Sequence, residues 1–344
     1  MKQQMLDFWN FGILPEALAK ERPVFTVTDL VWGEETAAVL RLCECTPRAG
    51  ASDYENFYAI CQAEPLLQGH PMPSRLSAFF YTCFGIKLSP TIENCDTIWA
   101  RVADLLAIDP TLLFFRLAQE VCTPINVLTR KNELPRVLPQ NTCPVLYANA
   151  LFADKPISRK EWESNMQAVL NRFTEAGCQT VLCRLPKDFC DRRPDPFHVE
   201  EALQSDLEDT ETRSLLWAQL LRFLSMECQN RGLSLMLEVD CDGREAVSCI
   251  GRIEREVGLP MLYWSTTRVD TRDAMLSFHA ASTHKNKMRC ALDVSAYPSR
   301  SELCEAVEAL SARYPRSLLR FYSNTPLWCL PYERSRVMGE EALP

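Results

Sequence analysis

The chain has 344 residues, 47% of them hydrophobic and 24% charged, and a formal net charge of −8. The apolar fraction is sufficient for a large core, and the acidic balance argues against nucleic acid or an anionic membrane surface as a partner. The sixteen cysteines are scattered singly apart from Cys43 and Cys45, with no second pair to complete a zinc site, so we interpret them as free thiols in a reducing compartment.

Residues 1–23 show neither a basic leader followed by an apolar run nor a small-residue cleavage site. Elsewhere no apolar stretch approaches the ~20 residues that a membrane-crossing helix needs. The sequence therefore predicts a cytoplasmic protein without a membrane segment.

The first predicted strand is PVFTVTDL, residues 23–30. The segment that follows, 34–120, has helical apolar spacing in RLSAFFYTCFGI (75–86) and CDTIWARVADLLAI (95–108), and prolines interrupt it between these stretches. We therefore expect a helical insertion over 34–120, placed after the first strand.

From about residue 121 short apolar runs alternate with amphipathic segments, which is typical of parallel strands joined by helices. Capping patterns predict helix starts at Ser158–Glu161, Asp270–Asp273 and Ser299–Glu302, and glycines predict helix ends at Gly177, Gly232 and Gly258. The predicted strands are Ile125–Leu128, Val145–Leu151, Thr180–Leu185, Ser234–Val239, Met261–Ser265, Met288–Val294 and Leu318–Tyr322. With the strand at 23–30 they make eight, so the prediction is a single (β/α)8 TIM barrel domain over 1–344 that contains the insertion.

Several short motifs occur in an order that points to a known family. They are Gly69-His70-Pro71-Met72, Phe84-Gly85-Ile86, TIENCDTIWARV (91–102), Thr129, Gly177-Cys178 and Arg231-Gly232. In this order and spacing the chain resembles the uronate (glucuronate) isomerase family of the amidohydrolase superfamily. The resemblance implies a TIM barrel, aldose–ketose isomerisation of glucuronate or galacturonate, and a divalent metal held by histidines at strand ends.

At the positions where the resemblance implies metal ligands, this chain has other residues. Alignment from Pro23 places Thr28, Asp29 and Leu30 where the family has His-Cys-His, and Glu238 where it has the histidine of strand five. The strand-four Asp-His and the strand-eight Asp-Ser-Arg correspond to about Leu182-Cys183 and Ser323-Asn324-Thr325. The four histidines of the chain, His70, His198, His279 and His284, lie away from the predicted strand ends. We expect no metal site and no cofactor, because such a metal needs several converging imidazoles or carboxylates.

Carboxylates at or near strand ends are the candidate catalytic residues, since a barrel builds its active site there and isomerisation needs a base. They are Glu238, Asp293 and Asp29, with Asp240 beside them. The alternative interpretation is loop capping or ion pairing with nearby arginines.

Arginines that follow strands are the candidate substrate-binding residues, because a guanidinium group binds a carboxylate through paired hydrogen bonds. They are Arg130, Arg184 and Arg268, and His70 joins them as a candidate contact from the insertion over the barrel. Solvated loop side chains are the alternative for all four.

Three functions stay open at this point. The first is a uronate-isomerase-like protein, which either is an active enzyme or has lost the activity. The second is a non-catalytic sugar-acid-binding or regulatory barrel, and the third is a metal-independent enzyme that uses Glu238 or Asp293 on another substrate. A small sugar acid is the expected partner, and a homo-oligomer is compatible with the sequence.

Overall fold

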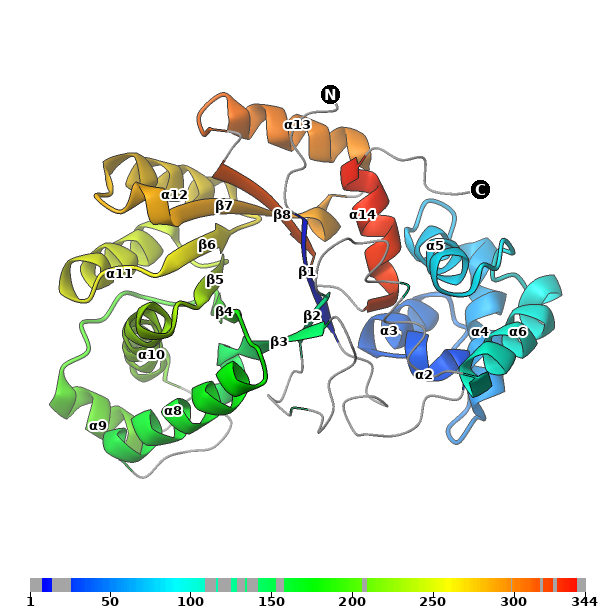
Figure 1. Ribbon diagram of the computed structural model, residues 1–344, viewed down its shortest axis with the longest axis horizontal. Coiled ribbons are helices and arrows are strands. Elements are labelled where there is room, and N and C mark those ends of the chain that lie inside the picture. The colour runs from blue at the N-terminus through cyan, green and yellow to red at the C-terminus, as the bar shows by residue number, and fades with distance from the viewer. Residues whose placement is uncertain are drawn as a thin grey trace.

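The protein folds as an α/β barrel with helices around it and a helical insertion at its side (Figure 1). The structure is a computed structural model, and it describes residues 8–13, 26–108, 116, 125–128, 134, 142–152, 158–205, 209–297, 299–315, 318–323 and 327–338. Eight parallel strands close into the barrel in sequence order, from β1 beside β2 round to β8 beside β1. The strands are β1 Phe8–Ile13, β2 Ile125–Leu128, β3 Thr142–Tyr147, β4 Thr180–Leu185, β5 Ser234–Val239, β6 Met261–Ser265, β7 Met288–Asp293 and β8 Leu319–Ser323.

The strands of the second half are buried on both faces, which explains why they appear in the sequence as short, nearly continuous apolar runs. In β4 and β5, for example, only the polar residues Arg184 and Ser234 are not fully buried. Predicted and observed strands agree to within a residue for β2 and for β4 to β8, whereas β3 begins at Thr142 and ends at Tyr147 instead of spanning Val145–Leu151. Residues Ala148–Phe152, which include the predicted end of that strand at Leu151, form a short 3-10 helix instead.

Seven helices with described bounds surround or close the barrel (Figure 1). They are α8 Arg159–Glu175, α9 Pro196–Gln204, α10 Thr210–Arg231, α11 Gly243–Glu256, α12 Val269–Ala281, α13 Arg300–Ser311 and α14 Leu330–Met338. The predicted caps Ser158 and Ser299 are confirmed, because each accepts a hydrogen bond from the backbone N–H of the glutamate three residues later.

One predicted cap, Asp270, is wrong. Helix α12 begins earlier, at Val269, and its N-cap residue is Arg268, which makes no side-chain capping bond. Asp270 lies within the first turn and forms an ion pair with Arg268 at 2.7 Å. The acidic residue complements the helix dipole from this position without being the cap.

The predicted first strand at 23–30 is also wrong. Residues Val27–Val31 form the short helix α2, and the strand that closes the barrel is β1, Phe8–Ile13. Thr26 caps α2, because its hydroxyl accepts from Asp29 N while the Asp29 carboxylate accepts from Thr26 N at 3.1 Å. The β-branched residues of this segment favour a strand locally, but this reciprocal capping box and the burial of one helical face outweigh that propensity.

Between β1 and β2 the chain forms a helical insertion. After α2 it contains α3 Glu34–Leu42, α4 Asp53–Ala63, α5 Met72–Phe84 and α6 Cys95–Ile108, which lie beside the barrel on the right of Figure 1. Its apolar core contains Phe57, Ile60, Phe79 and Phe80, and Val127 of β2 and Trp328 near α14 also belong to this core. Helix α14 packs against α5 and also contacts β1 and β8, so the end of the chain connects the insertion with the barrel.

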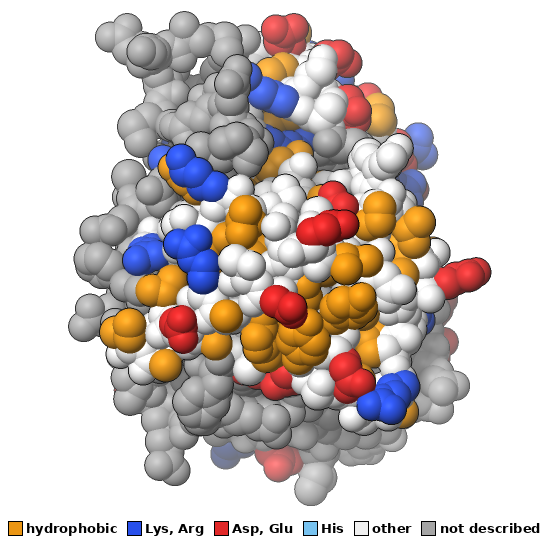
Figure 2. Space-filling model, turned by 90° about the vertical axis from the view of Figure 1, so that its right-hand side faces the viewer, with side chains coloured by type: hydrophobic (Ala, Val, Ile, Leu, Met, Phe, Trp, Pro, Cys, Tyr) orange, Lys and Arg blue, Asp and Glu red, His pale blue; other side chains and the backbone are white. Residues whose placement is uncertain are grey.

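The outer face of the insertion carries both apolar and acidic side chains. Figure 2 shows hydrophobic side chains gathered in the central and lower part of the described surface, with Asp and Glu side chains among them. No helix in the described parts of the chain combines the length and the apolarity that crossing a membrane requires.

Candidate active site at the mouth of the barrel

Polar side chains gather at the carboxyl ends of five strands. Arg184, Glu238 and Ser265 are paired in register across β4, β5 and β6, and Asp293 is paired with Tyr322 across β7 and β8. Because side chains alternate along a strand, Arg184, Glu238 and Ser265 share a face with the residues two positions before them. Those residues, Leu182, Met236 and Tyr263, belong to the apolar cluster that fills the barrel interior together with Tyr322. The polar layer therefore lies above this cluster, at the end where barrel enzymes build their active sites.

Glu238 is the most deeply buried carboxylate of this layer, with 5% of its surface exposed. Its Oε2 accepts a hydrogen bond from Arg184 Nε at 2.5 Å, and its Oε1 accepts one from the Tyr322 hydroxyl at 3.2 Å. Burying a carboxylate without partners costs much free energy, and these two hydrogen bonds offset that cost.

Arg184 is the half-exposed member of the layer, with 49% of its side chain accessible. Its backbone is held by Asn149, whose Oδ1 accepts from Arg184 N at 2.9 Å and whose Nδ2 donates to Arg184 O at 2.7 Å. Burial opposes the guanidinium charge, but the charge and hydrogen bond of Glu238 outweigh it and raise the pKa of Arg184. Within the described residues only Nε of the guanidinium group is hydrogen-bonded, which leaves Nη1 and Nη2 for a ligand.

Asp293 ends β7 and caps the short 3-10 helix that follows, η5 Val294–Ala296. Its Oδ1 accepts from Ser295 N at 3.0 Å and from the Ser295 hydroxyl at 2.6 Å. Burial raises the pKa of Asp293 to about 6 despite these bonds, and the charges of Glu238 and Glu333 add to the rise.

The charges of both carboxylates, Glu238 and Asp293, act on the pKa of Tyr322. Burial raises its pKa well above the usual value, and the negative charges of Glu238 and Asp293 raise it further. The hydroxyl therefore stays protonated and acts as a hydrogen-bond donor. With Asp293 as a group that titrates near neutral pH, the layer contains both a proton donor and a potential acid/base residue.

The described donors at the mouth do not fit the histidine-held metal that the resemblance implies. His198 lies on α9 and His279 on α12, where its Nε2 is bonded to Lys285 O, while His284 pairs with Glu254 and His70 precedes α5. Among the described residues no three His, Cys, Asp or Glu side chains converge in a way that could hold a metal ion. Moreover, one oxygen of Glu238 already faces a guanidinium cation.

The structure brings three of the predicted site residues together, Glu238, Asp293 and Arg184. Asp29 lies on α2 of the insertion and caps it, so its expected position at a strand end is wrong. Arg268 follows β6 but is exposed and paired with Asp270. Arg130 lies outside the described residues.

His70 is half-buried just before α5, and its Nδ1 accepts a hydrogen bond from Met72 N at 3.2 Å. Burial lowers its pKa, and the nearby positive charge of Arg75 lowers it further. The histidine is therefore a neutral acceptor at neutral pH, within the insertion.

Sequence reasoning missed Tyr322 and Ser265 as members of the site. Both stand at the ends of correctly predicted strands, so their position was a usable signal. Neither side chain is charged at neutral pH, so neither matches the carboxylate and guanidinium chemistry by which most of the other candidates were chosen.

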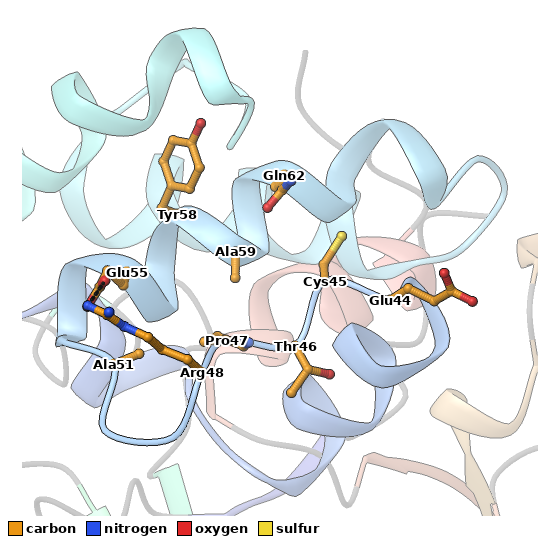
Figure 3. A pocket seen from close by; sticks show the side chains of 10 residues that line it. All are labelled: Glu44, Cys45, Thr46, Pro47, Arg48, Ala51, Glu55, Tyr58, Ala59 and Gln62. Carbon is orange, nitrogen blue, oxygen red and sulfur yellow. Dashed lines mark hydrogen bonds and ion pairs between the residues drawn. The ribbon is translucent and has the colours of Figure 1, made fainter.

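A separate hollow of about 230 Å³ lies in the insertion, away from the strand ends. Figure 3 shows it between the turn around Cys45–Arg48 and helix α4, with Arg48 extending along Glu55. These two side chains form an exposed ion pair at 2.8 Å. Because Arg48, the one cationic residue among the described residues that line this hollow, is already paired, the hollow has fewer groups available to bind a charged ligand than the mouth of the barrel.

Two solved structures share the fold of the whole chain. A uronate isomerase from Thermotoga maritima matches with a TM-score of 0.71 and 10% sequence identity, over 98% of this chain and 88% of that one. A glucuronate isomerase from Caulobacter crescentus matches with a TM-score of 0.66 and 13% identity, over 99% of this chain and 85% of that one. No protein-family profile matches the sequence, and no curated protein matches it. The likeness therefore concerns the fold, which is that of the uronate isomerases.

Proposed function

We propose that the protein binds a sugar acid of the uronate class at the mouth of its barrel, with Arg184 as the partner of the ligand's carboxylate. The half-exposed guanidinium group of Arg184, which Glu238 holds while Asn149 fixes the backbone of the same residue, is the observation that carries this proposal. Its Nη1 and Nη2 suit the paired acceptors of a carboxylate, and Glu238 and Asp293 can accept hydrogen bonds from sugar hydroxyls. The shared fold with two sugar-acid isomerases supports the same ligand class.

Thermal stability measured with D-glucuronate and with D-glucose tests the proposal. A ligand that binds only the folded state at 100 times its Kd stabilises it by about 2.7 kcal/mol, so glucuronate is expected to raise Tm. Glucose, which has no carboxylate, is expected to have a much smaller effect. Arg184→Met is expected to remove the shift.

Arg192→Met is the matched control, because Arg192 is also partly exposed and paired with a glutamate, Glu211, at 2.6 Å. It should leave the shift unchanged. A protein that responds to no sugar acid, or an Arg184→Met variant that responds like the parent, would overturn the proposal.

A second candidate function is metal-independent proton transfer on the bound sugar acid. It is supported by Asp293, whose raised pKa of about 6 suits a general acid or base at neutral pH. In aldose–ketose isomerisation such a base removes the proton from C2, next to the aldehyde carbon C1, and returns it to C1, while a second proton passes from the C2 hydroxyl group to the C1 oxygen. Conversion of glucuronate to the ketose in the presence of a chelator, lost in Asp293→Asn while binding persists, is the expected result. Binding without any turnover would identify a non-catalytic protein.

A further inference from the structure

A buried network of charged side chains joins the insertion to the last helix. Arg75 of α5 donates from Nε and Nη2 to Oε1 of Glu333 on α14, at 2.9 and 2.6 Å. Glu333 is completely buried, and Arg75 and Arg336 are exposed by only 6% and 7%. Glu35 of α3 binds the outer side of Arg75 at 2.8 Å. Each buried charge thus has an opposite charge at hydrogen-bond distance, as buried ions require.

The network continues from α14 to the mouth of the barrel. Arg336 Nη1 donates to the second oxygen of Glu333 at 3.0 Å and to Val294 O at 3.4 Å, and Arg336 Nη2 donates to Tyr297 O. These two carbonyl groups stand at the start and just beyond the end of η5, the turn that Asp293 caps with its side chain. Arg336 therefore holds both sides of the turn that follows Asp293.

We propose that Arg75 is a positioning residue for the mouth of the barrel: acting through Glu333 and Arg336, it fixes the turn 294–297 and with it the carboxylate of Asp293. The insertion is then part of the site's support. This inference rests on the proposed function for its consequence in ligand binding, but the positioning itself is measurable without a ligand.

The contacts explain why arginine is needed at position 75. A guanidinium group reaches Glu333 with two nitrogens and Glu35 with a third, whereas a lysine ammonium is a single point charge. Without a cation here, Arg336 is the remaining partner of Glu333 among the described residues, and Arg336 is drawn towards the excess negative charge. Its bonds to the carbonyl groups of Val294 and Tyr297 then weaken, because the same Nη1 serves both Glu333 and Val294.

Hydrogen–deuterium exchange of the ligand-free protein tests the positioning directly. In Arg75→Met the amides of 294–297 are expected to exchange about tenfold faster, because a locally held turn opens more often once its support is lost. Amides in α10, on the far side of the barrel, are expected to change little. Arg75→Lys is expected to increase the exchange of these amides to an intermediate degree. If Arg75→Met does not fold, the exchange measured in Arg75→Lys tests the inference.

Arg48→Met is the matched control, since Arg48 is an arginine of the insertion whose ion pair with Glu55 is exposed. It should leave exchange at 294–297 unchanged. Unchanged exchange there in both Arg75 variants, or an equal rise throughout the protein, would overturn the inference.

The pH dependence of glucuronate binding provides a second readout. If Arg75 positions Asp293, Arg75→Lys changes the surroundings of Asp293 and is expected to move the pH midpoint of binding. If Arg75 has a purely structural role, the substitution lowers stability and leaves the midpoint in place. If the parent protein binds no sugar acid, the proposed function fails, and the exchange experiment still decides the role of Arg75.

Discussion

At the scale of single residues, the site combines a fixed ion pair with one carboxylate that is held in an unfavourable setting. Glu238 is supported by Arg184 and Tyr322, whereas among the described residues Asp293 accepts hydrogen bonds from the two groups of Ser295 alone and lies near the charges of Glu238 and Glu333. A carboxylate that is poorly stabilised as an anion is typical of a functional position, where stability and activity conflict.

The raised pKa of Asp293 has a consequence for stability that depends on pH. Its pKa is about 6 in the folded protein against an ordinary value of 3.8, so between these values the folded state binds more protons than the unfolded state. Stability therefore falls as pH rises through this window, by up to ~3 kcal/mol. Asp293→Asn removes the charge and is expected to be about 1–3 kcal/mol more stable than the parent at pH 8, with the gain vanishing towards pH 4.

Urea unfolding at the two pH values measures this difference. Asp270→Asn provides a control of opposite sign, because the hydrogen bond and charge of Arg268 lower the pKa of Asp270. That variant should lose a little stability at pH 8 and none at low pH. A loss of stability in Asp293→Asn that is the same at both pH values would contradict the account of Asp293.

At the scale of elements, the helices behind the site are packed closely enough to fix the strand ends that they follow. Helix α11 follows β5, which carries Glu238, and α12 follows β6, which carries Ser265. The two helices meet at Gly243, where a Cβ atom would lie 2.6 Å from Thr271 Cα and 2.8 Å from Ala274 Cβ. Buried Thr271 also donates its hydroxyl hydrogen bond to Cys241 O at 2.8 Å, in the loop after β5.

Gly243→Ala is expected to destabilise the protein by about 1–3 kcal/mol, because the backbone of α12 must move to admit the methyl group. Gly251→Ala on the same helix is the matched variant. Its Cβ would meet the ring of Phe278 at 3.3 Å, which can turn aside, and alanine favours a helix over glycine by about 1 kcal/mol. It should therefore be neutral or stabilising. Unfolding in urea measures both changes, and equal effects of the two substitutions would contradict the close approach at Gly243.

At the scale of the whole molecule, stability comes from apolar burial in three places: the shell between strands and helices, the core of the insertion and the barrel interior. We therefore expect that incubation with a chelator changes Tm by less than about 1 °C, in contrast to domains in which metal binding supplies the folding free energy. Differential scanning calorimetry with and without the chelator measures this. A fall of many degrees that zinc reverses would reveal a ligand set outside the described residues.

The sequence by itself determined the strands from β4 to β8 and the helix starts at Ser158 and Ser299. Each of these is a local matter: a short apolar run buried on both faces makes a strand, and a serine that binds the N–H three residues later starts a helix. The sequence also placed Glu238, Asp293 and Arg184 at strand ends, which was enough to locate the mouth of the barrel.

Only the tertiary structure decided which segment closes the barrel and which side chains support the site. Closure depends on pairing β1 with both β2 and β8, whereas residues 26–31 form a capped helix in place of the predicted strand. The partnership of Arg75 with Glu333 spans 258 positions of the chain. No local pattern predicts it, because a buried ion pair depends on which surfaces the folded elements bring together.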